Sequence, residues 1–248
     1  MLKLIRLEEI PSTNAALKAM PHAEHGTVLL AKRQTAGRGR LGRSFASPDG
    51  GLYLSLLLCR KESPEQLLHL TPMVAVAVRR AIFDACGLWT DIKWINDLQV
   101  QGKKVCGILT ELDGMGRIIV GIGINCHTTE FPAELKDIAA SLHEFVPVDE
   151  EALLQALLLR LEELDDALIP QKAVWMAEYA AACITVGREV ELVRGESRRP
   201  AFAEAVDENG ALLVRFPDGT RDAIFMGEAQ IKVRIAKGIP FNFEGESI

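Results

Sequence analysis

The sequence has few cysteines, few aromatic residues and no long apolar run. Its 248 residues include five cysteines, which are widely scattered, and no Cys-x-x-Cys pair occurs. This pattern argues against a disulfide framework and against a zinc site, and it favours a reducing, cytoplasmic environment. The N-terminus lacks the apolar core of a signal peptide, and no run is long enough to cross a bilayer. We therefore expect no contact with a membrane.

Positive charge is scarce as well, with one local exception. The formal net charge is −6 at pH 7, which disfavours non-specific binding of nucleic acid. The exception is the run Gln34–Arg43 (QTAGRGRLGR), called the basic loop below, which holds three glycines and three arginines. Backbone amides and guanidinium groups together suit a small anionic ligand, above all a phosphate. Taken alone, the run is equally consistent with a solvated connection between two strands.

Two apolar runs, 27–31 and 51–58, flank the basic loop and predict strands that hold its ends. The loop lacks the Gly-Lys-Ser/Thr ending of a Walker A motif, and its spacing does not match a dinucleotide fingerprint. A nucleotide-binding site of either common type is therefore excluded, although binding of a phosphate is not.

Hydrophobic periodicity predicts an α+β domain followed by a small β domain. Strands are expected over 2–7, 27–31, 52–59 and 118–125, with two short ones around the turn 101–102, and helices over 15–20, 64–86, 150–168 and 171–182. Pro72 should kink the second helix or split it near Leu70, and Gly87 should end it. From residue 184 onward, five short strands separated by hairpin turns indicate a small barrel. The expected domains are 1–183 and 184–235, followed by a tail over 236–248.

Three further groups of residues are candidates for a binding site. Ser12, Thr13 and Asn14 precede a predicted helix, so they either cap it or point into a pocket. Lys104 lies near Gly107 in a strand that is otherwise apolar, and a cation there needs an anionic partner from the protein or from a ligand. The glycines at 121 and 123 lie in a buried strand, which is typical of a close approach by a ligand.

Four sequence blocks occur in the order and spacing of the biotin protein ligases, and the chain resembles this family over its whole length. The blocks are 12–14, 37–43, 93–97 with 104–111, and 121–125. The resemblance implies a mixed β-sheet packed with helices, as in the class II aminoacyl-tRNA synthetases, and a C-terminal SH3-like barrel. It also implies that biotin reacts with ATP to give biotinyl-5′-AMP and pyrophosphate. Biotin then passes to one lysine of a biotin carboxyl carrier protein, most simply that of acetyl-CoA carboxylase.

The resemblance further implies roles for individual residues. Biotin binding is implied for Ser12, Thr13, Asn14, Gln34, Gly37, Arg38, Arg40, Lys104 and Gly107. Nucleotide binding is implied for Arg38, Arg40, Arg43, Phe45, Asn96, Asn125 and Phe225. The catalytic cations would be Lys104, Arg38 and Arg40. Asp97 would support the Mg²⁺ that arrives with ATP, and no tightly bound metal is expected.

The sequence departs from the family pattern at three positions. Phe45 and Phe225 stand where the family usually has tryptophans, and Ile95 stands where it has a proline. The residues before position 12 leave no room for a helix-turn-helix, so we expect neither DNA binding nor the repressor function of some members. Members often dimerise, so a homodimer remains open.

Two other functions are compatible with the same motifs. A lipoate ligase would form a different acyl-adenylate on a related fold, and it would need a long apolar channel in place of a polar pocket. A non-catalytic biotin sensor would use the same pocket, with the barrel as an interaction module. Lys104 and the complete basic loop favour catalysis, because a sensor has no need to polarise a phosphate.

Overall fold

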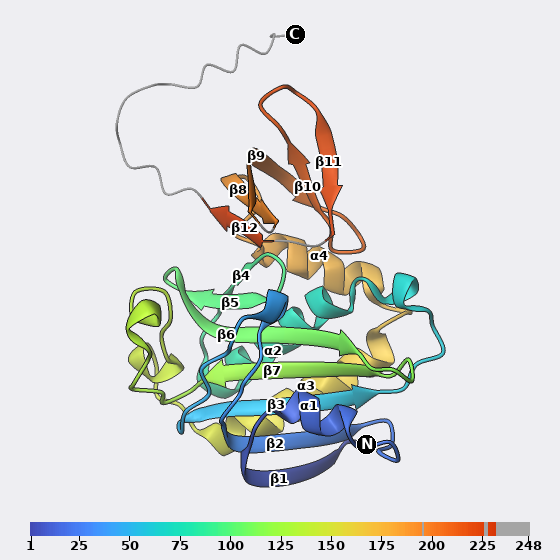
Figure 1. Cartoon of the computed structure of the whole chain (residues 1–248), viewed down its shortest axis with the longest axis vertical. Helices are drawn as coiled ribbons and strands as arrows, with labels where there is room; N and C mark the ends of the chain where they lie inside the picture. The colour runs from blue at the N-terminus through green and yellow to red at the C-terminus, as the bar shows by residue number, and fades with distance from the viewer. Residues whose placement is uncertain (195, 226–227, 232–248) are drawn as a thin grey trace.

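The computed structural model describes residues 1–194, 196–225 and 228–231, which form a large and a small β-sheet with four α-helices (Figure 1). The large sheet has seven strands in the order β1-β2-β3-β7-β6-β5-β4. Its first two strands are parallel, whereas its other neighbours are antiparallel, so the sheet is mixed as expected. The strands are β1 (Lys3–Ile10), β2 (Thr27–Gln34), β3 (Gly51–Leu58), β4 (Asp91–Lys93), β5 (Asp97–Val100), β6 (Lys103–Leu112) and β7 (Ile118–Asn125).

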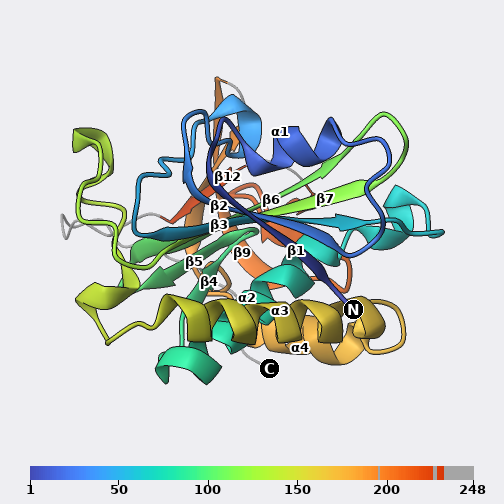
Figure 2. The ribbon, with the colours of Figure 1, turned by 90° about the horizontal axis from the view of Figure 1, so that it is seen from below.

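Helices cover both faces of the large sheet (Figure 2). Helix α1 (Thr13–Lys18) lies on one face, α2 (Leu70–Cys86) and α3 (Glu150–Ala167) lie on the other, and α4 (Lys172–Ala182) packs against α2. The central strands β3 and β7 are buried along their whole length, which explains their nearly continuous apolar sequences. No helix in the described part of the chain is both long and apolar enough to cross a membrane.

The helix expected over 64–86 is split, as Pro72 suggested. Pro64–Leu67 forms a 3₁₀ turn that begins with a capping box from Ser63, and α2 starts at Leu70. Pro72 thus lies in the first turn of α2, where its missing N–H has no helical partner to lose. Gly87 ends α2 in a left-handed conformation with φ of 68°.

The small sheet has five antiparallel strands in the order β11-β10-β9-β8-β12. They are β8 (Glu189–Arg194), β9 (Ser197–Val206), β10 (Leu212–Arg215), β11 (Arg221–Ile224) and β12 (Glu228–Ile231). Within the described residues β11 does not pair with β12, so closure into a barrel stays a prediction, as do the domain limits. The end of the last expected strand and the tail over 236–248 lie outside the described residues.

The connection between β4 and β5, residues 94–96, joins the large sheet to the small one and leads into the candidate site. The indole of Trp94 donates a hydrogen bond of 2.9 Å to the carbonyl of Gly210, and its backbone N–H donates to the hydroxyl of Thr185. Tyr179 donates to the carbonyl of Ile95 at 3.1 Å. Buried residues of both sheets belong to one hydrophobic cluster, so residues 94–96 contact both the large and the small sheet.

Candidate active site

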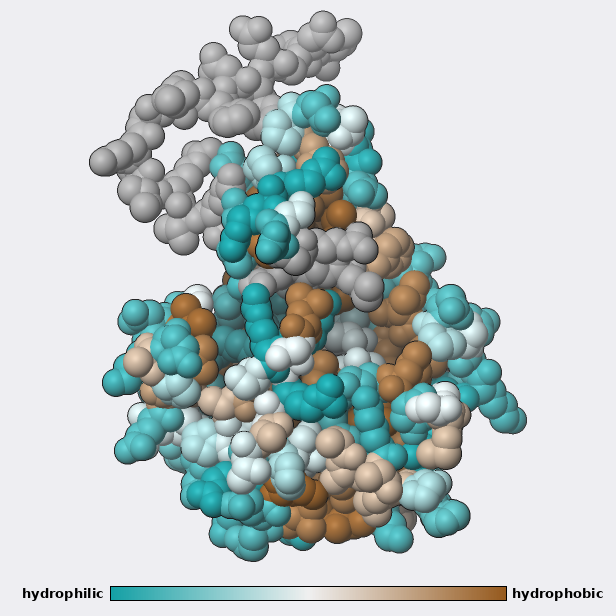
Figure 3. Space-filling view, viewed as in Figure 1, coloured by the Kyte–Doolittle hydropathy of each residue, from teal (hydrophilic) through white to brown (hydrophobic). Residues whose placement is uncertain are grey.

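A cavity opens to solvent on the face of the large sheet that carries α1. Its walls come from α1, from the basic loop after β2, and from strands β6 and β7. Figure 3 shows this side of the molecule, which is hollowed below the small sheet and mixes hydrophilic with hydrophobic residues. Two groups of lining residues differ in charge. The polar pocket consists of Ser12, Thr13, Asn14 and Gln34, and the cationic rim consists of Arg38, Arg40 and Lys104.

The start of α1 supplies most of the polar pocket. Ser12 is the N-cap, and its hydroxyl accepts from the backbone N–H of Ala15. Thr13 donates from both its backbone N–H and its hydroxyl to Oε1 of Gln34, at 2.9 and 3.1 Å. The amide nitrogen of Gln34 in turn donates to the hydroxyl of Ser47. Ser12 therefore caps α1 and lines the cavity as well, and Thr13 lines it beside Ser12.

Asn14 is oriented by partners from two strands. Its amide nitrogen donates to the carbonyl of Leu109 at 3.3 Å and to Oε2 of Glu111 at 2.8 Å. Its oxygen accepts from the hydroxyl of Ser55, which is fully buried and also lies 2.7 Å from the hydroxyl of Thr13. Because both amide hydrogens of Asn14 are used, its remaining capacity is that of an acceptor.

Ser55 was missed in the sequence, where its only signal is that it is the one polar residue in the apolar run 51–58. A serine in the middle of a buried strand must find hydrogen-bond partners inside the protein. Ser55 contacts Thr13 and Asn14, two predicted ligand-binding residues, and so helps to fix their orientation.

The glycines of β6 and β7 lie against side chains of the protein. A Cβ at Gly121 would lie 2.3 Å from Oδ1 of Asn14, and one at Gly123 would lie 2.5 Å from the ring of Phe45. A Cβ at Gly107 would meet the same ring at 2.9 Å. These glycines make room for protein side chains, and because all three also line the cavity, a close approach by a ligand stays a prediction.

Lys104 reaches the cavity because of a β-bulge. Side chains alternate along a regular strand, so residues 104 and 107 would lie on opposite faces of β6. The pairing of β6 with β5 shifts its register between Leu98 and Gln99, and a bulge of this kind re-aims the side chains beyond it. Consequently Nζ of Lys104 lies 3.0 Å from the position that a Cβ of Gly107 would take. The expected anionic partner is Asp97, whose Oδ1 lies 2.7 Å from Nζ.

The arginines of the cationic rim also contact protein acceptors. Arg40 donates to Oδ1 of Asn96 at 3.2 Å, and Asn96 itself donates to the carbonyl of Ile108 at 2.9 Å. Arg38 lies 3.6 Å from Oε1 of Glu111 as an ion pair. Asn96 is a neutral partner that an anionic ligand could replace, whereas Glu111 is also bound to Asn14 and Lys18.

The basic loop is folded back on itself as an irregular hairpin. Residues 34 and 47 form a β-bridge, as do residues 38 and 44. The backbone N–H of Gly39 donates to the carbonyl of Arg43, and that of Phe45 donates to the carbonyl of Gly37. A Cβ at Gly37 would lie 2.4 Å from the carbonyl oxygen of Phe45, so glycine is required where the two limbs of the loop meet.

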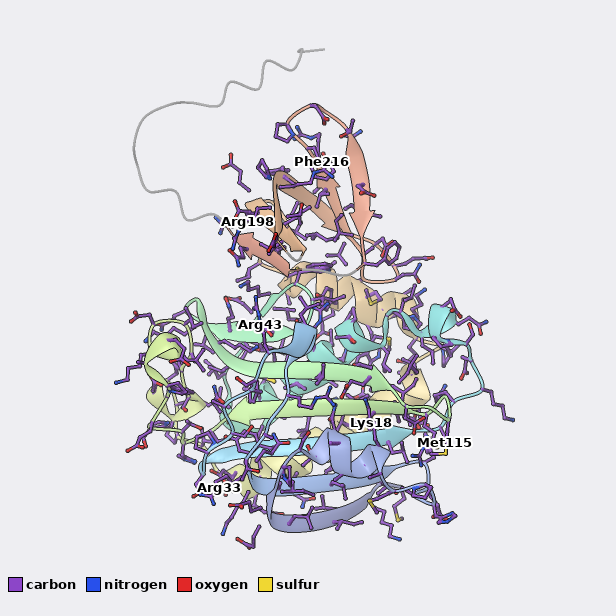
Figure 4. The ribbon with its side chains drawn as sticks, in the orientation of Figure 1. Lys18, Arg33, Arg43, Met115, Arg198 and Phe216 are labelled. Atoms are coloured by element: carbon purple, nitrogen blue, oxygen red, sulfur yellow. The ribbon has the colours of Figure 1, made fainter. Side chains whose placement is uncertain are left out.

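Five of the residues implied by the resemblance do not line the cavity: Gly37, Arg43, Asp97, Asn125 and Phe225. Arg43 follows the short turn of the basic loop, as labelled in Figure 4. Asn125 is buried and donates to the carbonyl of Ala140 at 3.1 Å. Phe225 lies just after β11 and is 46% exposed. The nucleotide-binding roles of Arg43, Asn125 and Phe225 therefore stay predictions.

The predicted role of Asp97 at a metal is not supported by its surroundings. One of its oxygens is paired with Lys104. In the described ranges no group of three or more His, Cys, Asp or Glu side chains is placed to hold a metal ion. The described lining of the cavity contains no carboxylate, so a Mg²⁺ ion there would depend on oxygens of phosphate and water. Binding of Mg²⁺ by Asp97 stays a prediction.

Comparisons with known proteins point to one family. The model of the Biotin/lipoate A/B protein ligase family matches residues 7–128, which include every residue that lines the cavity. The bifunctional ligase/repressor BirA of Bacillus subtilis is 37% identical over 215 residues, covering 81% of this chain and 65% of that protein. The biotin–[acetyl-CoA-carboxylase] ligase of Paracoccus denitrificans is 31% identical over 232 residues, covering 86% of this chain and 94% of that protein.

A solved structure shows that the fold is also similar to that of a biotin protein ligase. The structure of the biotin protein ligase from Aquifex aeolicus in complex with biotin and ATP superimposes with a TM-score of 0.82 at 34% identity. The superposition covers 94% of this chain and 99% of that one, so it includes the small sheet as well as the large one.

Proposed function

The chain belongs to the biotin protein ligase family, and from this membership we propose that it is a biotin–[acetyl-CoA-carboxylase] ligase. It joins biotin to AMP at the expense of ATP, releases pyrophosphate, and passes biotin to a lysine of a carrier protein. One observation carries the proposal: the polar pocket and the cationic rim belong to a single cavity. The first suits the uncharged ring of biotin, and the second suits its carboxylate and the phosphates of ATP.

The polar pocket complements a cyclic urea. Such a ring presents one carbonyl acceptor between two N–H donors. Asn14 offers an acceptor, because Leu109 and Glu111 take both of its amide hydrogens. The hydroxyl of Ser12 accepts from Ala15, so its hydrogen can be donated to the ligand. Gln34 donates one amide hydrogen to Ser47 and can donate the other to the ligand. The dithiolane ring of lipoate has no matching donors or acceptors, so this pocket favours biotin.

The cationic rim addresses the main barrier of the first step, which is repulsion between two anions. Lys104 and Arg40 would exchange their protein partners for the carboxylate and the phosphates, Arg38 would add a phosphate contact while it keeps Glu111, and the three cations would so neutralise both anions. A carboxylate oxygen then attacks the α-phosphorus in line, the new O–P bond forms, and the bond to pyrophosphate breaks. The step needs no protein nucleophile, because the cavity only has to position and screen the reactants.

The second step transfers biotin from the adenylate to the carrier. The amine of the carrier lysine attacks the carbonyl carbon of biotinyl-5′-AMP, an amide bond forms, and AMP leaves with the electrons of the broken C–O bond. The adenylate is a mixed anhydride that water also hydrolyses, so it needs a cover. Arg38, Gly39 and Arg40 of the basic loop line the cavity, so we propose that this loop closes over the adenylate.

A direct test is to incubate the purified protein with biotin and Mg²⁺-ATP and to look for bound biotinyl-5′-AMP by mass spectrometry. The carrier domain of acetyl-CoA carboxylase, added afterwards, should gain the mass of one biotinyl group. Lipoate in place of biotin is the matched control, and it should give no adenylate. Formation of the lipoyl adenylate without the biotinyl one would identify the protein as a lipoate ligase instead.

A further inference from the structure

Glu111 connects the polar pocket to the cationic rim, although it does not line the cavity itself. It lies on β6 two residues after Leu109, so its side chain is on the same face of the sheet, the one that carries α1. The side chain is 17% exposed. A carboxylate that is buried to this extent needs several partners, and Glu111 has them on three sides.

The two oxygens of Glu111 serve different elements of the site. Oε2 accepts from the amide of Asn14 at 2.8 Å. Oε1 lies 2.9 Å from Nζ of Lys18 and 3.6 Å from Nη1 of Arg38. One side chain thus contacts both the amide that faces the uncharged ring of biotin and a guanidinium of the loop that faces the phosphates.

Resting on the function proposed above, we propose that Glu111 is a positioning residue that couples the biotin and ATP sites. A ligand that fixes Asn14 also fixes the carboxylate, and the carboxylate then holds Arg38 over the cavity where the phosphates arrive. By linkage, ATP must strengthen the binding of biotin by the same factor as biotin strengthens the binding of ATP. Removal of the negative charge should abolish this mutual enhancement.

The carboxylate keeps its charge under ordinary conditions. Burial alone would raise the pKa of Glu111, but hydrogen bonds from Asn14 and Lys18, with the charges of Lys18 and Arg38, lower it below its usual value. The attraction to Arg38 is therefore present throughout the neutral range. A glutamine at this position would keep an oxygen that accepts from Asn14 while it loses the charge, so it separates the two contacts.

The test measures the Kd of biotin by calorimetry, with and without a non-hydrolysable analogue of ATP. In the wild-type protein the analogue should tighten the binding of biotin by at least about fivefold. Glu111→Gln should bind biotin alone within about twofold of wild type, because the acceptor for Asn14 remains. The enhancement by the analogue should then disappear.

Two further variants make the result specific. Lys18→Met is the matched control, because it removes the other cation from the same oxygen without touching the lining of the cavity, and it should keep the enhancement. Arg38→Met should lose the enhancement, and Glu111→Gln should add nothing in that background. If Glu111→Gln does not fold, Arg38→Met decides the question, and an enhancement retained there overturns the proposal.

The coupling is overturned if Glu111→Gln keeps the full enhancement, or if Lys18→Met loses as much. It is also overturned if the wild-type protein forms biotinyl-5′-AMP and shows no enhancement. A wild-type protein that binds no biotin would contradict the proposed function instead, so the two failures are distinguishable.

Discussion

The polar pocket and the cationic rim belong to one cavity, but they are built in different ways. In the pocket, Thr13 and Asn14 are 3% and 4% exposed, and their partners are uncharged groups or buried carbonyls, apart from Glu111. At the rim, the side chains of Arg38 and Lys104 are 52% and 31% exposed, and both are paired with carboxylates.

The difference in burial and charge gives the pocket and the rim different functions. A buried network of hydrogen bonds costs about 1–3 kcal/mol for each group left without a partner, so its geometry is set before a ligand arrives. An exposed ion pair contributes only about 0–1 kcal/mol, so incoming anions can compete with the protein carboxylates for these cations. The pocket is thus preorganised for recognition, and the rim is adaptable for reaction. The following changes should affect one region more than the other.

The largest effect is expected from Lys104→Ala at the rim. Loss of this cation should slow adenylate formation by at least about 100-fold, which corresponds to about 3 kcal/mol of transition-state stabilisation. Affinity for biotin should fall by no more than about fivefold, because the side chain of Lys104 is 31% exposed and solvent screens its charge. Exchange of labelled pyrophosphate into ATP at saturating biotin measures the rate. Lys103→Ala, on the same strand but outside the cavity, is the control, and an undiminished rate in Lys104→Ala would remove Lys104 from the mechanism.

The next effect is expected from Gly121→Ala in the pocket. The new Cβ would lie 2.3 Å from Oδ1 of Asn14, so the amide must move. We expect the affinity for biotin to fall by about 10- to 100-fold, because overpacking of this kind costs about 1–3 kcal/mol. Gly114→Ala is the control, since a Cβ there meets no atom within 4 Å. Calorimetry measures both proteins, and equal affinities would show that Asn14 does not bind the ligand.

Ser55→Ala should have a smaller effect of the same kind. It removes a buried hydroxyl that bonds to Thr13 and Asn14, and the affinity for biotin should fall by about tenfold, or about 1.4 kcal/mol. The rate at saturating biotin should stay near that of wild type. Ser141→Ala loses a comparable buried hydrogen bond outside the cavity, so it should lower the melting temperature and leave the affinity unchanged. Equal affinities of the two variants would contradict a supporting role for Ser55.

The smallest effect is expected from salt. Ions screen exposed charges more than buried dipoles, so raising KCl from about 0.05 to about 0.5 M should increase the KM for ATP several-fold. Affinity for the uncharged methyl ester of biotin should change by less than about twofold, because the pocket holds it by neutral hydrogen bonds. Steady-state kinetics and calorimetry give the two values. An equal response of both would mean that the two regions do not differ in the way described.

Much of the fold was predictable, because the deciding signals are local. The period of the apolar residues predicts α3, and Asp149 caps it as expected. The split of the helix near Leu70 follows from Pro72, and the turn after β5 follows from Gln101-Gly102. The candidate site was predictable in part, since the residues of 12–14, the basic loop and Lys104 do meet in one cavity.

The remaining features depend on contacts that no local pattern reveals. The bulge that turns Lys104 toward Gly107 arises from pairing with β5. Position 121 must be glycine because a Cβ there would collide with Asn14. Asn14 is far away in the sequence, so the sequence shows only that a side chain is not tolerated. Asn125 and Phe225 were assigned to the nucleotide by resemblance, and the structure places one in the core and the other at the surface, away from the cavity lining.

The most direct test of the central claim compares Ser55→Ala with Lys104→Ala in two measurements, the Kd of biotin and the rate of pyrophosphate exchange at saturating biotin. A preorganised pocket beside an adaptable rim predicts a crossed result. Ser55→Ala should weaken binding by about tenfold with a nearly normal rate, and Lys104→Ala should lower the rate by at least about 100-fold with far weaker effects on binding. Parallel losses of both quantities in both variants would contradict the division.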